Sequence, residues 1–171
     1  SDVMADLSHL ALLEVSGEDA ESFLQGQLSC DVKSIAPGAA SLGSYCTPKG
    51  RMLASFFLLR AADHFLMVLA ADIATAIHKR LSMFVMRAKV KIAHRGDDLV
   101  LLGFSGASWQ DALHPIDSVA ADPAGVCKPF TLPDSRGLLP LAATVAVATW
   151  PALSARCTPV GADAWQWLDI R

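Results

Sequence analysis

The fold is indicated first by the stretch LLEVSGEDAESFL, residues 12–24. The apolar residues 10–15 predict a short strand, and Ser16-Gly17 begins a turn into a helix whose apolar positions recur at helical spacing. The same pattern returns in LLGFSGASWQDAL, residues 101–113, where five of the thirteen aligned positions are identical. Two interpretations stay open: a common strand-to-helix pattern that occurs twice, or a duplicated α+β unit.

Between these two stretches the sequence predicts a three-stranded antiparallel meander. β-like runs cover residues 41–47, 51–60 and 65–70. Pro48-Lys49-Gly50 separates the first two runs and is typical of a tight turn. Strands joined to neighbouring strands, with helices interspersed, indicate an α+β class rather than a doubly wound parallel sheet.

A second helix and a further hairpin are expected after the meander. Asp72 can cap a helix that runs to about residue 86, with Phe84 among the residues of its inner face. Residues 90–93 and 99–104 are then expected to pair with each other as a hairpin.

The C-terminal part of the chain is less regular. Strands are expected over residues 127–132 and 138–149, on either side of a hairpin turn at residues 133–137. Asp163 is the expected N-cap of a last helix, whose apolar residues run to the terminus without a Gly or Asn stop. We therefore expect the chain to be the N-terminal part of something longer.

Length and composition predict a folded globular protein. The chain has 171 residues, of which 53% are hydrophobic and 18% charged, and this composition excludes intrinsic disorder. The length suits one domain or two small subdomains, and no uninterrupted apolar run reaches the roughly 18 residues of a membrane-spanning helix. We place a first α+β subdomain at residues 1–95 and a second, related one, truncated at its C-terminus, at residues 96–171.

Charge and cysteine content narrow the expected partners and location. The 14 Lys+Arg and 17 Asp+Glu leave a net charge of −3, which gives no general attraction to nucleic acid or anionic membranes. The four cysteines, Cys30, Cys46, Cys127 and Cys157, form no C-x-x-C pair. Because no secretory apolar segment opens the chain, we expect reduced thiols in a cytoplasmic protein.

Two short stretches stand out, since the sequence otherwise carries no common nucleophile, phosphate-loop, dinucleotide or zinc motif, and we expect no catalytic residue and no metal ligand. The first is FLQGQLSCDV, residues 23–32, where Gly26 inside a helix costs about 1 kcal/mol relative to Ala. That glycine indicates either close approach by a backbone or ligand, or a helix packed tightly on the sheet. The second is YCTPKGRML, residues 45–53, a hairpin with Lys49 and Arg51 at its tip.

Together these stretches resemble the YgfZ/GcvT-like folate-binding family, a distant relative of the glycine cleavage T-protein aminomethyltransferase. The family's opening pattern, F-L-Q-G-Q-x-[ST]-x-D-V, is matched by residues 23–32, and its hairpin tip, [TDS]-x-K-G-[RK]-[ML], by residues 47–52. Residues 84–92 are similar to its helix-to-strand segment, and residues 165–170 to a later helix. The resemblance covers nearly the whole chain and implies a GcvT-like fold of two related subdomains.

Departures from the family pattern bear on activity. The T-protein hairpin carries a carboxylate pair that supports aminomethyl transfer, whereas RMLASF, residues 51–56, contains no acid that could handle a proton. The YgfZ-like branch lacks that acid too, so the sequence fits this branch better. The branch's K-G-C-Y-x-G-Q-E signature does not occur here. We therefore expect a binding or accessory protein rather than a self-sufficient enzyme.

The resemblance implies a folate site between the two subdomains. Folate has a flat pterin ring and an anionic glutamate tail, so it needs an apolar or aromatic slot, fixed polar groups and positive charge. The family's ring-contacting aromatics correspond to Leu10, which is not aromatic, and to Trp165, which could alternatively be a core tryptophan. The expected cofactor-binding residues are Leu10, Gln25, Gln27, Asp31, Lys49, Arg51 and Trp165.

A basic tract offers a second location for an anionic ligand. No acid occurs between Asp72 and Asp97, while six of the 14 basic residues do. A solvated helix face is the usual meaning of such a run, and a groove for a polyglutamylated folate or for tRNA is the alternative. Direct nucleic-acid binding is not expected, because aromatic residues do not interleave with the cations. The six residues are Lys79, Arg80, Arg87, Lys89, Lys91 and Arg95.

These observations lead us to expect the N-terminal folate-binding region of a bacterial protein of this family. The resemblance implies a tetrahydrofolate-dependent accessory role in iron–sulfur cluster assembly or repair, and thereby in tRNA modification. Folate and iron–sulfur proteins are the implied partners, and no membrane is expected. Two alternatives stay open: a folate-dependent aminomethyl transferase, and an interaction module that keeps the fold but has lost its ligand.

Overall fold

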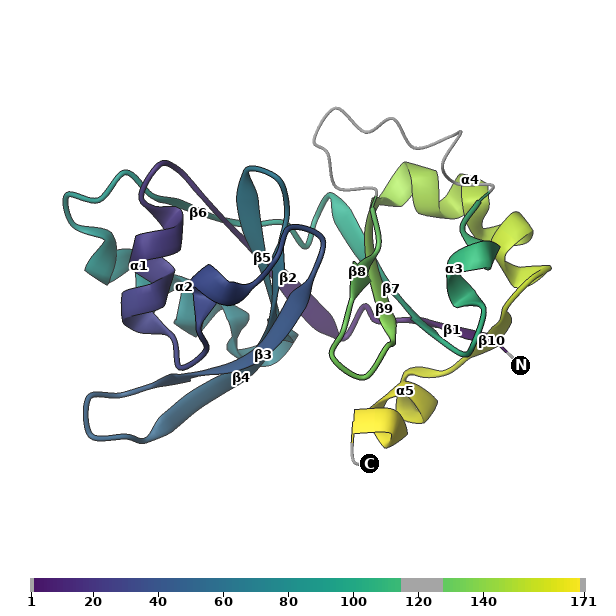
Figure 1. Ribbon diagram of the computed structural model, residues 1–171, viewed down its shortest axis with the longest axis horizontal. Coiled ribbons are helices and arrows are strands. Elements are labelled where there is room, and N and C mark those ends of the chain that lie inside the picture. Colours follow the sequence, from purple (N-terminus) through teal and green to yellow (C-terminus); the bar gives the residue numbers. More distant parts are fainter. Residues whose placement is uncertain (1, 115–127, 170–171) are drawn as a thin grey trace. The chain divides into compact units, whose positions relative to one another are not determined.

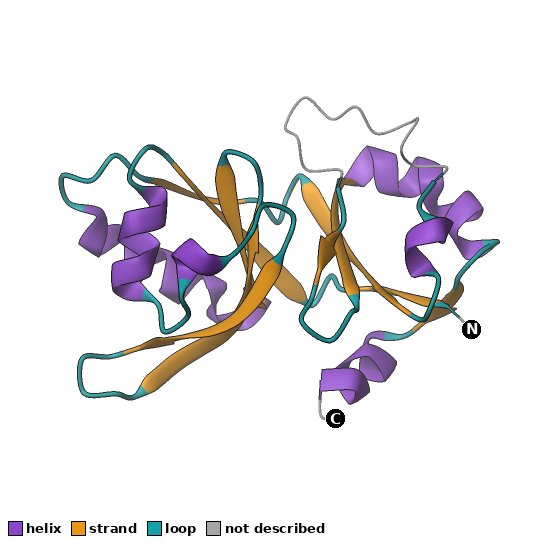
Figure 2. Cartoon of the chain, viewed as in Figure 1, coloured by secondary structure: helices purple, strands orange, loops and turns teal. Residues whose placement is uncertain are grey.

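A computed structural model describes residues 2–114 and 128–169 of the chain (Figure 1). The chain divides into two compact units. One unit is Leu10–Asp97, and the other combines Ser1–His9 with Asp98–Arg171. Each unit contains a five-stranded sheet with helices, so the expected α+β class is confirmed (Figure 2).

The Leu10–Asp97 unit is an antiparallel sheet covered by helices. Its elements are β2 (Leu10–Ser16), α1 (Ala20–Gln27), the short 3-10 helix η1 (Val32–Ser34), β3 (Ala40–Cys46), β4 (Met52–Arg60), β5 (His64–Ala70), α2 (Ala71–Val85) and β6 (Lys91–His94). The strand order is β3-β4-β5-β2-β6, with every neighbouring pair antiparallel. The predicted meander is therefore confirmed as β3, β4 and β5.

A single hydrophobic core joins the sheet of this unit to α1 and α2. Alternate residues of β2 face the helices because strand side chains alternate between the two faces of a sheet. Residues three and four apart on each helix cover them, because such residues share one helix face. On these three elements the buried core residues are Ala11, Leu13, Val15, Ala20, Leu24, Ala74, Ile77 and Leu81.

The second predicted helix is present, but two details of the prediction were wrong. β5 runs into α2 without a loop, so Asp72 lies within the first turn and Ala70 is the N-cap. Phe84 does not belong to the inner face, since it is 43% exposed. The inner row of α2 runs from Ile77 to Leu81 and then, four residues on, to the half-buried Val85.

The other unit has a mixed sheet with helices of its own. Its elements are β1 (Val3–Asp6), β7 (Leu99–Ser105), α3 (Trp109–Ala112), β8 (Phe130–Thr131), β9 (Gly137–Ala142), α4 (Ala143–Ser154), β10 (Thr158–Val160) and α5 (Ala162–Asp169). The strand order is β10-β1-β7-β9-β8. β1 is parallel to β10 and antiparallel to β7, and the remaining pairs are antiparallel.

The hairpin expected from residues 90–93 and 99–104 does not form. β6 pairs with β2 in one unit, whereas β7 pairs with β1 and β9 in the other. The chain passes from one unit to the other at Asp97–Asp98, where a turn between paired strands was expected. The prediction was wrong because it assumed that consecutive strands are partners.

The apolar run at residues 138–149 is part strand and part helix, which corrects the prediction of one long strand. β9 ends at Ala142, and α4 begins at the next residue. An uninterrupted apolar run satisfies either structure, so periodicity could not locate this boundary. Asp163 was also misplaced: it lies within the first turn of α5, and Gly161 O accepts hydrogen bonds from Ala164 N and Trp165 N.

The two units share a common plan, which supports the duplicated α+β unit. In each one a Ser-Gly turn connects a strand to a helix, β2 to α1 and β7 to α3. Gly17 and Gly106 both have positive φ, +117° and +136°. β5 then runs directly into α2, which leads to β6, just as β9 runs directly into α4, which leads to β10. Two strands have no counterpart among the described residues: β1, which lies between β10 and β7, and β3, at the edge of its sheet.

The division of the chain differs from the expected 1–95 and 96–171 at the N-terminus. Ser1–His9 belongs to the unit formed by Asp98–Arg171. The reason is strand pairing, because β1 has hydrogen-bonded neighbours only in that unit. Met4 and Leu7 are both 0% exposed, so the segment also contributes apolar side chains to the protein interior.

Candidate ligand-binding site

The two sequence motifs singled out above meet in the Leu10–Asp97 unit. After α1 ends, Leu28 forms a β-bridge with Tyr45 of β3. Ser29 and Ser44 are joined three times: Ser29 N donates to Ser44 O (3.0 Å), Ser44 N donates to Ser29 Oγ (2.8 Å), and Ser44 Oγ donates to Ser29 Oγ (2.9 Å). We call this contact the Ser29–Ser44 junction. It anchors residues 23–32 to the strand that leads to the basic hairpin tip.

Sequence reasoning did not single out either member of this junction. Ser29 lies inside the quoted motif, but Ser44 is an unremarkable strand residue fifteen positions later. Their pairing depends on how α1 ends, with Leu28 extended (φ −106°, ψ 158°) and buried beneath β3. A polar residue at the end of a helix is a weak signal, and only the strand register reveals its partner.

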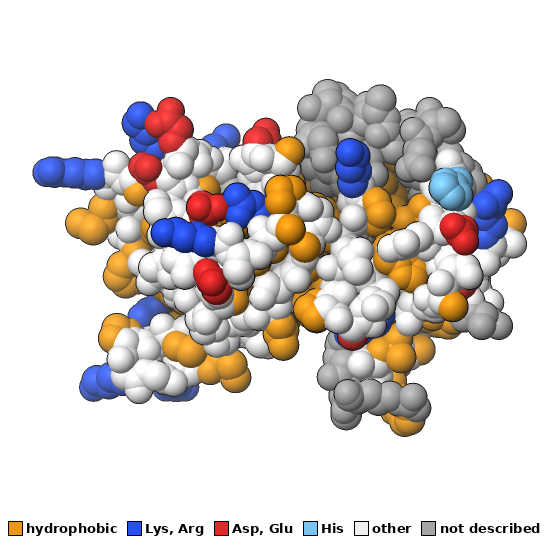
Figure 3. Space-filling model, viewed as in Figure 1, with side chains coloured by type: hydrophobic (Ala, Val, Ile, Leu, Met, Phe, Trp, Pro, Cys, Tyr) orange, Lys and Arg blue, Asp and Glu red, His pale blue; other side chains and the backbone are white. Residues whose placement is uncertain are grey.

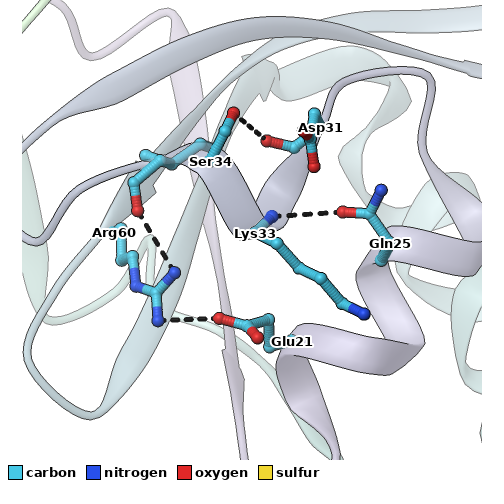
Figure 4. A network of polar contacts seen from close by, with 7 residues as sticks. Glu21, Gln25, Asp31, Lys33, Ser34 and Arg60 are labelled. Atoms are coloured by element: carbon cyan, nitrogen blue, oxygen red, sulfur yellow. Dashed lines mark hydrogen bonds and ion pairs between the residues drawn. The ribbon is translucent and has the colours of Figure 1, made fainter.

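Polar contacts hold η1 between α1 and β4 (Figure 4). Gln25 Oε1 accepts a 3.1 Å hydrogen bond from Lys33 N, and Ser34 Oγ donates to Asp31 O at 2.8 Å. Arg60 at the end of β4 forms a 2.7 Å ion pair with Glu21 of α1 and donates from Nη1 to Ile35 O at 3.1 Å. These contacts fix the backbone of the whole segment that follows α1.

The expected site residues on and after α1 have different roles in this geometry. Gln25 is engaged in positioning η1, so its carbonyl oxygen is occupied. Gln27 is half-buried, and its amide forms no hydrogen bond within the described part of the chain. Asp31 is exposed, and its main-chain oxygen accepts the hydrogen bond from Ser34 Oγ of η1. Gly26 is exposed, and a Cβ there would meet nothing within 4 Å. Among the described residues, no atom lies close enough to this position to require a glycine there.

Lys49 and Arg51 occupy the tip of the β3–β4 hairpin, which extends beyond the rest of its unit (Figure 1). Both side chains are exposed. The turn itself is rigidly closed: Arg51 N donates to Thr47 Oγ1 at 3.1 Å, and Thr47 N donates to Arg51 O at 2.8 Å. Gly50 has φ +79°, which suits this position. The tip therefore presents two cations on a defined backbone.

Cys30 packs against Gly43 of β3, beside the Phe56 ring. A Cβ at Gly43 would lie 2.9 Å from its Sγ and 2.8 Å from the Phe56 ring, so only glycine allows this close contact with β3. Burial raises the pKa of the Cys30 thiol, and the negative charge of Asp31 raises it further. Cys30 is therefore a neutral thiol at physiological pH and a poor nucleophile.

The remaining cysteines bear on the expectation of reduced thiols. Cys46 and Cys157 are free, as Cys30 is, and Cys127 lies outside the described residues. Burial raises the pKa of the Cys157 thiol as well, with a contribution from Asp2. Across residues 2–114 and 128–169, no three His, Cys, Asp or Glu side chains could hold a metal ion. In those same ranges, no helix is long and apolar enough to cross a membrane.

The two positions expected to contact the pterin ring lie in different units. Leu10 begins β2 and is partly exposed. Trp165, on α5 of the other unit, is 2% exposed. Its ring packs against Gly103, where a Cβ would lie 2.7 Å away, and Arg136 Cζ lies 4.8 Å from the ring centroid. Within its unit Trp165 is a core residue, as the alternative interpretation had it, and a ligand contact there stays a prediction.

The basic tract is not one continuous groove of free cations. Lys89 Nζ forms a 2.8 Å ion pair with Glu18, and Arg95 pairs with Glu14. Arg80 is half-buried on α2. The exposed cations for which no side-chain partner is recorded are Lys79, Arg87 and Lys91.

Comparison with known proteins identifies the family. Residues 2–132 match the GCVT N-terminal domain family, which is well over half of the chain. The chain belongs to this family. The resemblance drawn from the two motifs of this GCVT-family chain is thereby confirmed.

Curated relatives of this GCVT-family chain include several YgfZ proteins. The tRNA-modifying protein YgfZ of Edwardsiella ictaluri is 38% identical over 101 residues, covering 59% of this chain and 30% of that protein. The Klebsiella pneumoniae protein of the same name is 32% identical over 133 residues, covering 78% of this chain and 39% of its own length. The chain thus spans well under half the length of these relatives.

Solved structures similar to this GCVT-family chain bear on the fold. The glycine cleavage system aminomethyltransferase T from Bartonella henselae superposes with a TM-score of 0.73 at 20% identity, covering 94% of this chain and 47% of that one. A heterotetrameric sarcosine oxidase from Corynebacterium sp. U-96 gives a TM-score of 0.52 at 12% identity. The match covers 89% of this chain and 81% of the oxidase chain. At these identities the likeness shows the fold alone, and the expected GcvT-like fold is confirmed.

Proposed function

We propose that this chain is the tetrahydrofolate-binding part of a tRNA-modifying protein of the YgfZ type. Its role would be that of an accessory protein in assembling or repairing the iron–sulfur clusters on which tRNA-modifying enzymes depend. The family match and the name shared by the curated relatives support this proposal. Iron–sulfur proteins are the partners that it implies.

The observation that carries the proposal is the Ser29–Ser44 junction. It brings the segment with Gly26 and Gln27 to the strand that leads to Lys49 and Arg51. In this proposal a single ligand contacts both stretches. Both stretches carry the sequence features by which the chain resembles folate-binding proteins.

The residues present suit the polar parts of a folate. Gln27 offers an amide that could pair with the donor and acceptor edge of a pterin, and Gly26 leaves room for close approach. Lys49 and Arg51 are exposed cations, and Arg in particular binds carboxylates in a bidentate manner. In this proposal they hold the glutamate tail. Trp165 is buried in the other unit, with Arg136 over its ring, so a folate contact there would require the ring to become accessible.

The proposal is one of binding and positioning. When bound, tetrahydrofolate would supply one-carbon chemistry through its own nitrogen atoms. The β4 stretch that follows the tip contains no Asp or Glu from Arg51 to Phe56, so no carboxylate there can hold a proton for aminomethyl transfer. The residues of the site accordingly bind and orient the folate, and we assign none of them a proton-transfer step.

Calorimetric titration with tetrahydrofolate and with its triglutamate form tests the proposal. We expect saturable binding of both, with the triglutamate bound about tenfold more tightly, because two exposed charge pairs together contribute on the order of 1–2 kcal/mol. Lys49→Ala with Arg51→Ala should abolish the preference for triglutamate. Gln27→Ala should weaken both ligands equally.

Matched controls separate binding from folding. Lys128→Ala removes another exposed cation, in the other unit, and should leave both affinities unchanged. Trp165 should be changed to Phe rather than Ala, because truncating a buried tryptophan costs about 3–5 kcal/mol and would unfold the core around it. Failure of the wild-type chain to bind either ligand at millimolar concentration would rule the proposal out.

A further inference from the structure

An exposed apolar cluster lies at the C-terminal end of α2, where the proposed folate site makes no use of it. Seven large hydrophobic side chains are exposed among the described residues, and three of them fall within residues 83–86. Met83 is 65% exposed, Phe84 43% and Met86 86%. Contiguous exposed apolar side chains mark interaction surfaces, whereas isolated ones do not.

Cations border this cluster. Lys79 lies one turn before Met83 on the same helix face, and Arg87 follows Met86 directly. Both are exposed and form no ion pair with any residue of the described ranges, and the sequence holds no acid between Asp72 and Asp97. Figure 3 shows hydrophobic and basic side chains at this edge of the unit, on the left of the view. We call Lys79, Met83, Phe84, Met86 and Arg87 the α2-end patch.

The backbone at the end of α2 holds Met86 outward. Met86 is the C-cap and has φ +47° and ψ −109°, a region that non-glycine residues rarely adopt. Its side chain consequently leaves the helix surface and gains no burial within the unit. Glycine would adopt this backbone conformation more easily, yet the residue here is a methionine with a large apolar side chain.

We propose that the α2-end patch is a docking surface for an acidic, apolar segment of a partner protein. Unbranched methionines adapt to differently shaped apolar side chains, which suits a protein partner. Lys79 and Arg87 would pair with carboxylates at the rim of the contact, where charges guide association and set the orientation. A second copy of this chain is a poor occupant, because two such patches would bring like charges together.

Methionine methyl NMR tests this docking surface with controls that the chain already contains. The five methionines are Met4, Met52, Met67, Met83 and Met86. Met4 and Met67 are 0% exposed, and Met52 is 62% exposed but lies on β4. The probe is an 18-residue amphipathic peptide of Leu and Glu, and its counterpart with Lys in place of Glu is the control. We expect saturable shifts of the Met83 and Met86 methyls with the Glu peptide only.

Two variants separate docking from folding. Met86→Gly removes the most exposed side chain at a φ that suits glycine, so the fold should be retained while peptide affinity falls at least tenfold. Lys79→Glu with Arg87→Glu should weaken the Glu peptide at least tenfold and create binding of the Lys peptide. Tetrahydrofolate affinity should be unchanged in both variants, which keeps this proposal distinct from the proposed function.

Four outcomes would overturn the docking surface. The first two are the absence of saturable shifts at Met83 and Met86, and equal shifts with the Glu and Lys peptides. The other two are shifts with phosphatidylserine vesicles, or with unmodified tRNA, that are larger than those with the Glu peptide. The last two would assign the same cations to a membrane surface or to nucleic acid instead.

Discussion

At the residue scale, three glycines differ in whether the surrounding structure requires a glycine at that position. Gly17 and Gly106 have φ of +117° and +136°, and a Cβ at either would overlap its neighbours, the Lys89 carbonyl oxygen at Gly17 and the Asp2 carboxylate at Gly106. Gly26 has an ordinary helical φ and open space around it. The first two therefore serve the strand-to-helix turns, whereas the third has no structural role within its unit.

These glycines should respond to alanine in opposite directions. We expect Gly17→Ala and Gly106→Ala to lower the free energy of unfolding by about 1–3 kcal/mol, because both combine backbone strain with a clash. Gly17→Ala should be the more severe, because the three atoms nearest to its Cβ are all backbone atoms, whereas the nearest atom at Gly106 is a side-chain oxygen that can move. Gly26→Ala should raise stability by about 0.5–1 kcal/mol. Urea unfolding measures all three.

The Gly26 variant also bears on the proposed ligand. If a folate lies beside α1, the added methyl group should weaken tetrahydrofolate binding while stabilising the fold. A stabilised variant with unchanged affinity would place the ligand elsewhere.

The Cys30 thiol is expected to react slowly. Burial raises its pKa, and Asp31 adds to this shift, so the thiolate fraction is small at pH 7 and grows only well above it. Alkylation by iodoacetamide, followed by peptide mass spectrometry, should show Cys30 reacting more slowly than an unstructured cysteine peptide. Asp31→Asn should speed the reaction. A Cys30 that is alkylated as fast as the peptide at pH 7 would contradict the assigned burial.

At the scale of elements, we expect the Ser29–Ser44 junction to hold the segment after α1 in a fixed position against β3. Ser29→Ala removes the acceptor of both Ser44 N and Ser44 Oγ, and it should cost about 1–2 kcal/mol. Ser44→Ala removes only the side-chain bond and should cost about half of that. Hydrogen exchange should show faster exchange of Ser44 and of η1 amides in Ser29→Ala. Equal losses of stability in the two variants would mean that the hydrogen bond from Ser44 N to Ser29 Oγ contributes nothing of its own.

Which elements were predictable depended on local signals. The β3–β4–β5 meander was predictable because turn residues separate its strands, and α1 because its apolar residues recur at helical spacing. The boundary between β9 and α4 was not, because residues 138–149 are apolar throughout. The wrong hairpin at residues 90–104 shows a second limit, since strand pairing is decided by distant partners.

At the scale of the whole molecule, the N-terminal strand completes a sheet whose other strands lie between residues 99 and 160. Within residues 2–114 and 128–169, β10 pairs with no strand but β1, and β7 also pairs with β1. We expect deletion of residues 1–9 to unfold the Asp98–Arg171 segment while the continuous Leu10–Asp97 unit stays folded. Amide NMR spectra can be compared with that of residues 10–97 alone. Retained dispersion of the β7 and β9 amides would contradict this dependence.

The candidate site was predictable in its motifs and not in its contacts. Gln27, Lys49 and Arg51 were recognisable from local patterns, and the structure leaves each with an available polar group. The Gln25 side-chain oxygen accepts a hydrogen bond from Lys33 N, and the Trp165 ring is buried in the core of its own unit. Such contacts depend on residues that come together only in the folded chain.

The sequence by itself determined the class of fold, the repeated strand-to-helix turn and the family, because each is written in short-range patterns of apolar residues, glycines and motif letters. Tertiary structure alone decided that β1 joins the second sheet, that β6 and β7 separate, and that Ser29 meets Ser44. The physical reason is that hydrogen-bonded register and core burial are settled between distant segments, where no local preference specifies the partner.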